Sequence, residues 1–277
     1  MERQAWNNIN EFATNTIKAA GQLILDDFGR VAADPKGRFD LVTATDLAVE
    51  KLLQQEIQRN FPEHDMIAEE SIQAGKISLD TFCWVIDPLD GTVNFALGIP
   101  FFSISLALLQ SGEPILGWVY DPIRQELFRA AQGKGSFVNE QPLTINADRS
   151  LPLPVGGSSD FIDWSVRAGR SALLSDLLGD FGKLRVMGSQ ALHLCYVAAG
   201  RLRAAISWEA KLWDDAAGAL IAQEAGASYT DFWGQPVFPV AAGSPLLFGG
   251  AIHSVAASPG THARLLIMLA QAGDDLS

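Results

Sequence analysis

The sequence predicts an α/β protein, and three observations lead to this prediction. The 277 residues are 48% hydrophobic and 19% charged, enough apolar material for one large α/β domain or two smaller domains. Segments with helical spacing and segments with strand-like patterns both occur along the chain. A stretch rich in Pro, Gly and Ser at 150–159 separates an α+β half, residues 1–149, from a layered α/β half, residues 150–277.

Two helices are predicted in the first sixty residues. Helical spacing extends from about Trp6 to Phe28 and stops at Gly29. A second helix is expected from about Asp46 to Asn60, with Pro62 beyond its end. Its expected inward face consists of Leu47, Leu52, Leu53 and Ile57. Between the helices, residues 34–38 (Asp-Pro-Lys-Gly-Arg) are expected to form an exposed loop with two cations.

Strands are predicted next. Residues 82–86 form an apolar run, and residues 102–108 alternate large and small side chains. Segments 115–120 and 126–130 flank an Asp-Pro turn and predict a hairpin. After residue 159 we expect helix, strand, helix, strand and helix, including a clear helix over 216–225 that ends at Gly226.

Charge and composition exclude several functions. A net charge of −12 argues against nucleic acid as a partner, because phosphate backbones are bound by Lys and Arg surfaces. Cys83 and Cys195 form no CxxC pair and are predicted to be reduced core thiols. No HxxxH pair occurs, so a zinc hydrolase is not expected, and His193 is predicted to pack in a helix. With neither a membrane-length apolar run nor a secretory leader, we expect a cytoplasmic protein without membrane association.

The most informative segment is Trp84–Thr92 (Trp-Val-Ile-Asp-Pro-Leu-Asp-Gly-Thr), which ends an apolar strand with two carboxylates and a hydroxyl. Pro88 biases Asp87 toward extended geometry, so Asp87 and Asp90 can converge across a tight turn but not along one helical turn. The glycine that follows allows a ligand to approach the backbone, and amides at the next helix start can face an anion. Oxygen ligands favour Mg²⁺, Mn²⁺ or Ca²⁺ over zinc. The alternative is a β-turn whose Asp side chains bond their own backbone.

Two other acidic pairs have simple explanations when each is taken alone. Glu69 and Glu70 follow a short apolar stretch, where a solvated acidic turn is expected. Asp214 and Asp215 lie at the start of a helix, where an acid complements the helix dipole without any metal, and Asp215 is expected to be solvated.

A further segment, Asp-Leu-Val-Thr-Ala-Thr-Asp at 40–46, leads into the second helix, and Thr45 or Asp46 is a candidate N-cap. Taken in order, DLVTATD, AEES, WVIDPLDGTVNF and LWDDAAG resemble the inositol monophosphatase family, which are magnesium-dependent, lithium-sensitive phosphomonoesterases. The resemblance covers nearly the whole chain. It implies a five-layer αβαβα sandwich of the inositol monophosphatase and sugar phosphatase type.

The resemblance also implies roles for individual residues. It surrounds a first Mg²⁺ with Glu69, Asp87, the backbone carbonyl of Leu89 and Thr92. It places a second Mg²⁺ between Asp87, Asp90 and Asp214, so that Asp87 bridges the two ions. Supporting positions are Asp46, in an adjoining water and third-metal network, and Glu70. The amides of Gly91 and Thr92 would bind the phosphate.

The implied chemistry is an in-line displacement by water. Glu69 and Thr92 would act with one Mg²⁺ to activate the water, and the second Mg²⁺, held by Asp90, would stabilise the leaving oxygen. No covalent enzyme intermediate is needed, and the chain offers no convincing Ser-His-Asp or Cys-His arrangement. Mn²⁺ is expected to substitute for Mg²⁺, whereas Ca²⁺ and Li⁺ are expected to inhibit.

The chain departs from the family pattern around the substrate. Leu97 stands where His, Lys or a similar polar residue is common, and Ser207 stands where the animal enzymes have a Glu that contacts a substrate hydroxyl. If residues 205–209 are extended, Ser207 and Glu209 face the same side, so Glu209 is a candidate replacement. A surface acid at a strand end is the alternative. Ser158 and Ser189 also fall in segments that shape the family's substrate pocket.

Myo-inositol 1-phosphate is the leading substrate that the resemblance implies, and histidinol phosphate is the alternative. Fructose 1,6-bisphosphate and 3′-phosphoadenosine 5′-phosphate are the next candidate substrates. The family's habit predicts a homodimer acting on a small phosphorylated metabolite. Two readings from other classes stay open: a regulatory binding protein on the same fold, and a metal-binding protein without turnover.

Overall fold

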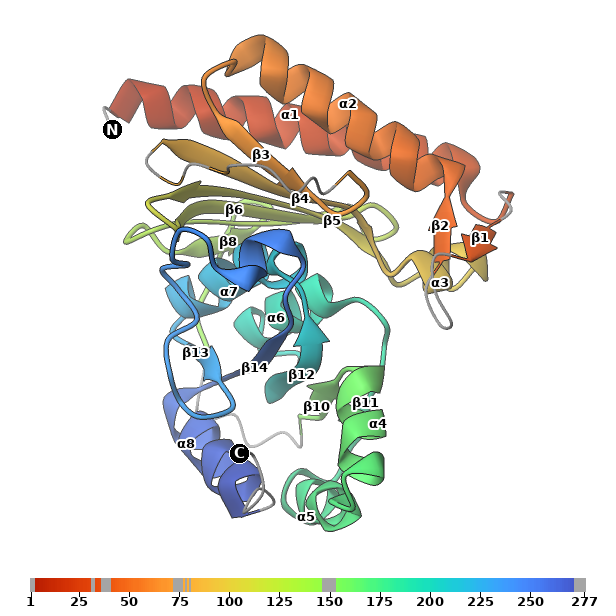
Figure 1. Ribbon diagram of the computed structural model, residues 1–277, viewed down its shortest axis with the longest axis vertical. Helices are drawn as coiled ribbons and strands as arrows, with labels where there is room; N and C mark the ends of the chain where they lie inside the picture. The colour runs from red at the N-terminus through yellow and green to blue at the C-terminus, as the bar shows by residue number, and fades with distance from the viewer. Residues whose placement is uncertain are drawn as a thin grey trace.

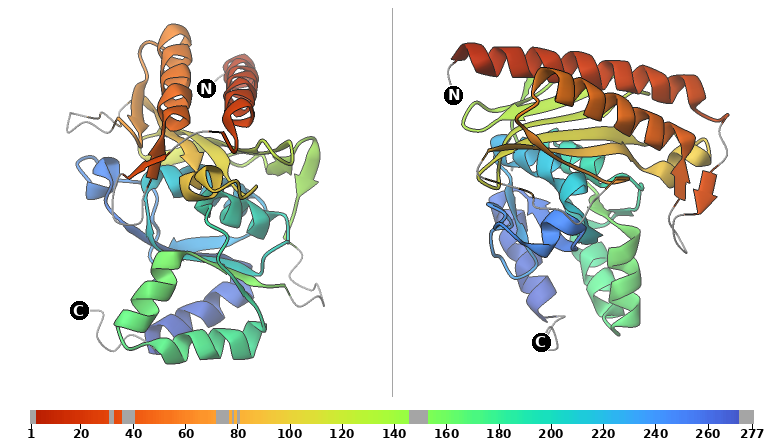
Figure 2. Two further views of the ribbon diagram at one scale, coloured as in Figure 1. Left: turned by 90° about the vertical axis from the view of Figure 1, so that its right-hand side faces the viewer. Right: turned by 45° about the horizontal axis from the view of Figure 1, so that its top comes forward.

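The computed structural model describes residues 3–30, 33–35, 41–71, 77, 79, 81–145 and 153–271. Figure 1 shows five layers in the order helix, sheet, helix, sheet, helix, and Figure 2 shows the two outer helix layers on opposite sides of the molecule. The predicted αβαβα sandwich is therefore confirmed.

The first layer contains α1 (Arg3–Asp27) and α2 (Ala44–Asn60), which lie on one face of the first sheet (Figure 1). The buried stripe of α1 has spacings of three and four and consists of Ile9, Ala13, Ile17, Ala20 and Ile24. In α2 the prediction for Leu53 and Ile57 is confirmed, but that for Leu47 is wrong, because Leu47 is 54% exposed. Val49 belongs to the buried stripe. Leu47 lies two residues before Val49 and therefore points about 200° around the helix from it.

The first sheet has seven strands in the order β3-β4-β5-β6-β7-β8-β9. Their bounds are β3 (Asp65–Ala68), β4 (Phe82–Asp90), β5 (Ser103–Gln110), β6 (Glu113–Asp121), β7 (Glu126–Ala131), β8 (Ser136–Val138) and β9 (Gln141–Leu143). The pair β3 and β4 is parallel and the other pairs are antiparallel. The predicted hairpin is confirmed as β6 and β7.

The remaining N-terminal elements are short. The strands β1 (Ala33–Pro35) and β2 (Leu41–Thr43) pair with each other, and α3 (Thr92–Ala96) follows β4. The expected loop over 34–38 is therefore partly strand, and residues 36–38 lie outside the described residues.

The middle layer consists of α6 (Gln190–Ala198) and α7 (Leu212–Glu224), which lie between the two sheets (Figure 1). Both helices are apolar on nearly every side, as helices covered on two faces must be. Gly117 of β6 allows close approach, because a Cβ there would lie 3.0 Å from the carbonyl oxygen of Ala217. His193 is buried in α6, as predicted.

The second sheet has the order β11-β10-β12-β14-β13. Its strands are β10 (Val155–Gly157), β11 (Leu184–Arg185), β12 (Ala204–Ala210), β13 (Ser228–Asp231) and β14 (Ile252–Ala257). The last layer is α4 (Ser159–Arg167), α5 (Ser171–Phe181) and α8 (Pro259–Gln271), and a short 3₁₀ helix covers Pro245–Phe248.

The predicted element order after residue 159 is therefore incomplete. It contains three helices and two strands, whereas the described residues from 159 onward form five α-helices and four strands. These strands are two to seven residues long, too short to show a clear period. The strand β10 also lies inside the Pro/Gly/Ser-rich stretch, and residues 146–152 are not described. The division at residue 149 stays a prediction.

The two cysteines agree with the prediction from the sequence. Cys83 and Cys195 are free and buried in the structure. Of the helices that the structure describes, none is both long enough and apolar enough to cross a membrane.

Candidate functional site

Asp87 and Asp90 both lie in β4, beside an irregularity in its pairing with β5. Asp87 pairs with Ser105 and Asp90 with Ser103, so three steps along β4 match two along β5. The extra residue forms a bulge between Asp87 and Asp90. This stretch contains Pro88, and bulges tolerate proline because the ladder hydrogen bonds are interrupted there. Side chains three apart in a regular strand face opposite sides, whereas the bulge turns the two carboxylates toward the same side. Asp87 also accepts the backbone N–H of Leu89 at 2.9 Å.

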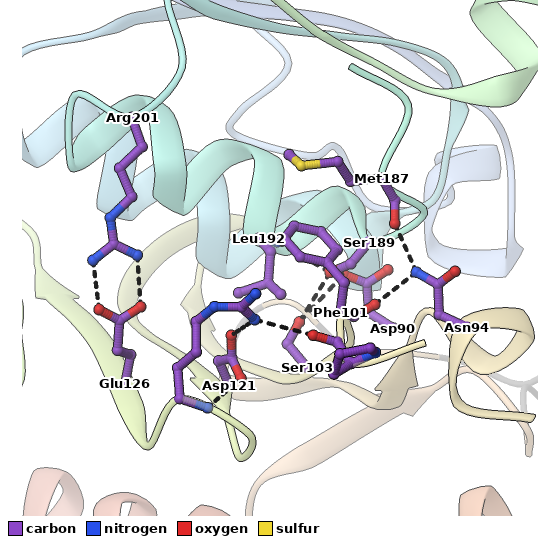
Figure 3. A network of polar contacts seen from close by, with 12 residues as sticks. Asp90, Asn94, Phe101, Ser103, Asp121, Glu126, Met187, Ser189, Leu192 and Arg201 are labelled. Carbon is purple, nitrogen blue, oxygen red and sulfur yellow. Dashed lines mark hydrogen bonds and ion pairs between the residues drawn. The ribbon is translucent and has the colours of Figure 1, made fainter. Parts of the chain in front are cut away.

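Asp90 connects the first sheet to the start of α6. Its carboxylate accepts the hydroxyl of Ser189 at 2.5 Å and the backbone N–H groups of Gln190 and Ala191 at 3.1 and 2.8 Å. The hydroxyl of Ser103 adds a bond of 3.3 Å (Figure 3). A carboxylate at a helix N-terminus satisfies N–H groups that have no partner within the helix.

Asp214 lies in the first turn of α7. Its carboxylate accepts the backbone N–H of Lys211 at 2.6 Å, which caps the helix as the simpler explanation predicted. The preceding residue is also held, because the carbonyl oxygen of Trp213 accepts the hydroxyl of Ser105 at 2.9 Å. One carboxylate oxygen from each of Asp87, Asp90 and Asp214 lies within 4.8 Å of the other two.

Thr92 lines the site and is held in place by Asp46. The hydroxyl of Thr92 lies 2.9 Å from Asp46 Oδ1 and 3.0 Å from the carbonyl oxygen of Leu89. Asp46 is the third residue of a capping box, and it accepts the backbone N–H of Thr43 at 2.9 Å and the Thr43 hydroxyl. The N-cap of α2 is therefore Thr43, and the prediction of Thr45 or Asp46 is wrong by two or three residues.

The acidic turn that follows β3 is held by α2. Glu50, which is 4% exposed, accepts the backbone N–H of Glu70 at 2.8 Å. Gln54 donates to Glu50 at 3.2 Å and to the hydroxyl of Ser71 at 2.7 Å. The backbone of Glu69 bonds to the carbonyl oxygen of Ile86 at 3.2 Å, which fixes this acid beside β4.

A cavity of about 410 Å³ opens over these groups. The expected metal and phosphate residues that line it are Glu69, Asp87, Leu89, Asp90, Gly91, Thr92 and Asp214. A second cavity of about 160 Å³ adjoins it, and the expected substrate residues that line this one are Ser158, Ser189, Ser207 and Glu209. Asp46 and Glu70 line neither cavity.

Burial and mutual repulsion dominate the electrostatics of the carboxylates. Burial, followed by the charges of Glu69, Asp90 and Asp214, raises the pKa of Asp87 well above 3.8. Burial raises the pKa of Asp90 to about 6, although its hydrogen bonds oppose the shift. Burial and the charge of Asp90 likewise raise the pKa of Asp214. Three clustered carboxylates that repel one another fit a divalent cation with oxygen ligands.

Several contributing residues escaped the sequence interpretation. Ser103 and Ser105 occupy small positions of the alternating segment 102–108, and only the register shows that they face the acids. Asn94 donates to the carbonyl oxygens of Phe101 and Met187 at 2.7 and 2.6 Å and so joins two loops (Figure 3). Asp215 is expected from the sequence to be solvated, but it is fully buried. Its carboxylate accepts hydrogen bonds from the side chains of Gln190 and Tyr229 at 2.9 and 2.7 Å. No local sequence signal marks such long-range contacts.

Comparison with known proteins agrees with this geometry. The inositol monophosphatase family matches residues 5–272. The protein named Nus factor SuhB from Pasteurella multocida is 38% identical over 258 residues, 91% of this chain and 92% of its own. Inositol-1-monophosphatase from Synechocystis is 38% identical over 257 residues, 88% of this chain and 85% of its own. The solved structure of a Thermotoga maritima IMPase superimposes with a TM-score of 0.82 at 29% identity, covering 98% and 100% of the two chains.

Proposed function

This chain belongs to the inositol monophosphatase family and is a phosphomonoesterase, and from this premise we propose that it hydrolyses small phosphate monoesters with Mg²⁺, myo-inositol 1-phosphate first among them. The inositol-1-monophosphatase of Synechocystis supports this substrate. Histidinol phosphate is the second candidate, because the exposed acids Asp160 and Glu209, which line the smaller cavity, would suit a leaving alcohol with a positive charge.

The observation that carries the proposal is the convergence of three carboxylate oxygens within 4.8 Å at the edge of a cavity of about 410 Å³. Oxygen-only donors suit hard divalent cations such as Mg²⁺ and Mn²⁺. Membership of the family makes Ca²⁺ and Li⁺ the expected inhibitors. Asp87, Asp90 and Asp214 would hold one cation, and Glu69, Asp87, the carbonyl of Leu89 and Thr92 a second. Bound there, the cations would lower the pKa of water and offset charge at the leaving oxygen.

The chain's own groups supply orientation. Thr92 is positioned by its contacts with Asp46 and the carbonyl of Leu89, so its hydroxyl oxygen can align an attacking water. Glu69 lines the same cavity and would accept a proton from that water. The backbone N–H groups of Gly91 and Thr92 would bind phosphate oxygens at the turn into α3.

Gly91 has φ +102°, a left-handed conformation that favours glycine, and a Cβ there would lie 2.9 Å from the carbonyl oxygen of Gly188. These constraints explain why the turn into α3 requires a glycine at this position. We further propose a cytoplasmic homodimer with no nucleic-acid partner. The relative named Nus factor SuhB keeps open a regulatory binding role on the same fold.

The test is phosphate release at fixed Mg²⁺ from inositol 1-phosphate, histidinol phosphate, fructose 1,6-bisphosphate and 3′-phosphoadenosine 5′-phosphate, with and without EDTA. We expect turnover that requires metal and is fastest on one of the first two substrates. Turnover that survives EDTA would refute the metal assignment. A folded protein that releases phosphate from none of them would favour the regulatory role.

A further inference from the structure

A third cavity, of about 540 Å³, is lined by α1 and by the first sheet, and it is larger than the two cavities described above. The helix α1 covers the face of this sheet that is turned away from the middle helix layer (Figure 1). None of the proposed metal, phosphate or substrate residues lines this cavity. Six of its lining residues have polar or aromatic side chains: Trp6, Asn7 and Asn10 of α1, Arg129 of β7, Lys134 of the loop after β7, and Phe137 of β8.

This cavity is far from the site of the metal-binding carboxylates. Trp6 lies near the start of α1, whereas Asp27, at the other end, accepts the hydroxyl of Thr45 at 2.8 Å. Thr45 is the neighbour of Asp46, which bonds to the hydroxyl of Thr92. Most of the 25-residue helix therefore separates the two sites, roughly 30 Å at a rise of 1.5 Å per residue.

The charge of the third cavity is opposite to that of the other two. Arg129 and Lys134 line it, and no Asp or Glu of the described residues does. The chain as a whole has a net charge of −12, and acids line both of the other cavities. A concave surface with one sign of charge concentrates ions of the opposite sign. This cavity therefore favours an anion, whereas the carboxylate site favours cations.

The polar side chains of this cavity mostly donate hydrogen bonds. Lysine and arginine have donors and no acceptor, and the indole of Trp6 has a donor only. The amide oxygen of Asn10 already accepts the indole N–H of Trp118 at 3.1 Å, so the group of Asn10 that is left for a ligand is its amide nitrogen, a donor. An anion is the ligand that accepts from all of these groups.

Both cations are held in position by neighbouring residues. The guanidinium of Arg129 lies 5.1 Å from the ring centroid of Phe137 and pairs with Glu140 at 3.0 Å. The side chain of Glu140 is 87% exposed, and an ion pair so open to water is weak, so a ligand can compete with it for Arg129.

The loop that carries Lys134 is fastened to the middle helix layer. The backbone N–H groups of Gly133 and Gly135, on either side of Lys134, both donate to the carboxylate of Glu224 in α7 at 2.7 Å. Because the loop is already ordered, binding of a ligand beside it costs less conformational entropy.

The rest of the lining is apolar. The partly buried rings of Trp6 and Phe137 line the cavity together with Leu116, Ala130 and Ala131. An apolar lining with a few polar groups is typical of small-molecule sites. Aromatic side chains also pack favourably against another ring. The lining therefore suits a ligand that has a flat apolar part besides its negative charge.

We propose that this cavity binds a small organic anion with a flat apolar ring, that is, an aromatic carboxylate, sulfonate or phosphate. Its anionic group contacts Arg129 and Lys134 through charge-assisted hydrogen bonds, and its ring packs against Trp6 and Phe137. Binding requires no metal and does not compete with a phosphate ester at the carboxylates. The site is therefore additional to the proposed phosphatase activity and independent of it.

The experiment is titration calorimetry of the intact protein at pH 7.5 in EDTA, so that no metal at the carboxylates attracts an anion. The probe is 1-naphthalenesulfonate, which has a flat ring and a fixed negative charge and is not a substrate for a phosphatase. 1-Naphthalenesulfonamide keeps the ring without the charge, and methanesulfonate keeps the charge without the ring. We expect one probe molecule per chain and at least about tenfold weaker binding of each comparison compound.

Lys134→Gln and Arg129→Gln should each weaken binding of the probe at least about tenfold, the loss expected for a hydrogen bond to a charged group. Lys134 is exposed, so its variant should fold normally. Lys183→Gln and Arg167→Gln are the matched controls and should bind the probe as the unaltered protein does. Lys183 is an exposed lysine, Arg167 forms an exposed pair with Asp163 at 2.7 Å, and neither cation lines this cavity.

Several outcomes would overturn this site. One is a folded protein that does not bind the probe, or that binds it no better than either comparison compound. Another is a loss in the control variants as large as that in Lys134→Gln, which would assign binding to general surface charge. Displacement of the probe by inositol 1-phosphate would place it at the carboxylates instead. Phosphate release with Mg²⁺ is measured separately, so each of these outcomes leaves the proposed function untouched.

Discussion

The carboxylate of Asp90 accepts the backbone N–H of Ala191 at 2.8 Å across 101 residues of sequence. Asp90 ends a strand of the first sheet, and Ala191 lies in the first turn of a helix of the middle layer. The site is therefore complete only when these two layers pack together. Figure 3 shows this junction and, nearby, the ion pair of Arg201 with Glu126 that joins the same layers.

Asp87→Asn should separate stability from activity. It removes one of four repelling carboxylates, so the metal-free protein should melt a few degrees higher at pH 7.5, about the shift that 1 kcal/mol produces in a chain of this size. Turnover should fall about a thousandfold or more, because the shared metal ligand is lost. Thermal unfolding in EDTA and phosphate release with Mg²⁺ measure the two effects.

Asp90→Asn should abolish Mg²⁺ binding at the position it shares with Asp214, without the gain in stability. Its carboxylate accepts from Ser189, Gln190 and Ala191, and an amide nitrogen in place of one oxygen would face donors. We expect an unchanged or lower melting temperature in EDTA and, in calorimetry, the loss of one of the Mg²⁺ sites. Near-normal activity in this variant would contradict the proposed metal ligands.

Mg²⁺ should stabilise the protein more at pH 7.5 than at pH 5. Because the pKa of Asp90 in the folded state is about 6, above its ordinary 3.8, protonation stabilises the metal-free fold below pH 3.8 and this contribution is lost as the pH rises through 6. Mg²⁺ must also displace the proton to bind. The rise in melting temperature that Mg²⁺ causes should therefore be larger at pH 7.5 than at pH 5. A rise that is the same at both pH values would contradict the raised pKa of Asp90.

Thr92→Val should lower kcat by about a hundredfold, because valine keeps the shape but lacks the hydroxyl that contacts Asp46 and the carbonyl of Leu89. Thr92→Ser keeps that hydroxyl and should retain activity within about a factor of ten. The comparison uses steady-state kinetics with both variants shown to be folded by circular dichroism. Similar losses in the two variants would exclude a role for the hydroxyl.

Glu50→Ala should raise the Mg²⁺ concentration needed for half-maximal activity about tenfold, as expected when support for a metal ligand is removed. Glu50 holds the backbone of Glu70, and the neighbouring Glu69 is the proposed ligand. Glu56→Ala is the control, because Glu56 lies on the same helix and its carboxylate pairs with Arg59, away from the acidic turn. Equal Mg²⁺ requirements in the two variants would remove Glu50 from this role.

Gly91→Ala should lower activity at least about a hundredfold, since a shift of about 1 Å in a positioning group has effects of this size. Its Cβ would lie 2.9 Å from the carbonyl oxygen of Gly188, so the turn into α3 must move. Gly98→Ala is matched for backbone strain, because Gly98 also has a positive φ but open space around its missing Cβ. Gly98→Ala should therefore lose stability without a comparable loss of kcat.

Local chemistry determined much of this protein from the sequence. Helical spacing located the two long N-terminal helices, and alternation located the central strands. The resemblance carried by the motifs around Asp87, Asp90 and Asp214 implied a phosphatase with metal ligands. Short elements such as β10 and β11 were missed, because two or three residues carry no period.

The tertiary structure sets which distant residues contact these motifs. The bulge that turns Asp87 and Asp90 to one side depends on the pairing of β4 with β5. The burial of Asp215 depends on Tyr229. The burial of His193 depends on the packing of α6 against the second sheet. The sequence by itself determined which chemical groups are present and on which kind of element, but hydrogen bonds between residues a hundred positions apart arise only from packing, because no local pattern records which partner each group will meet.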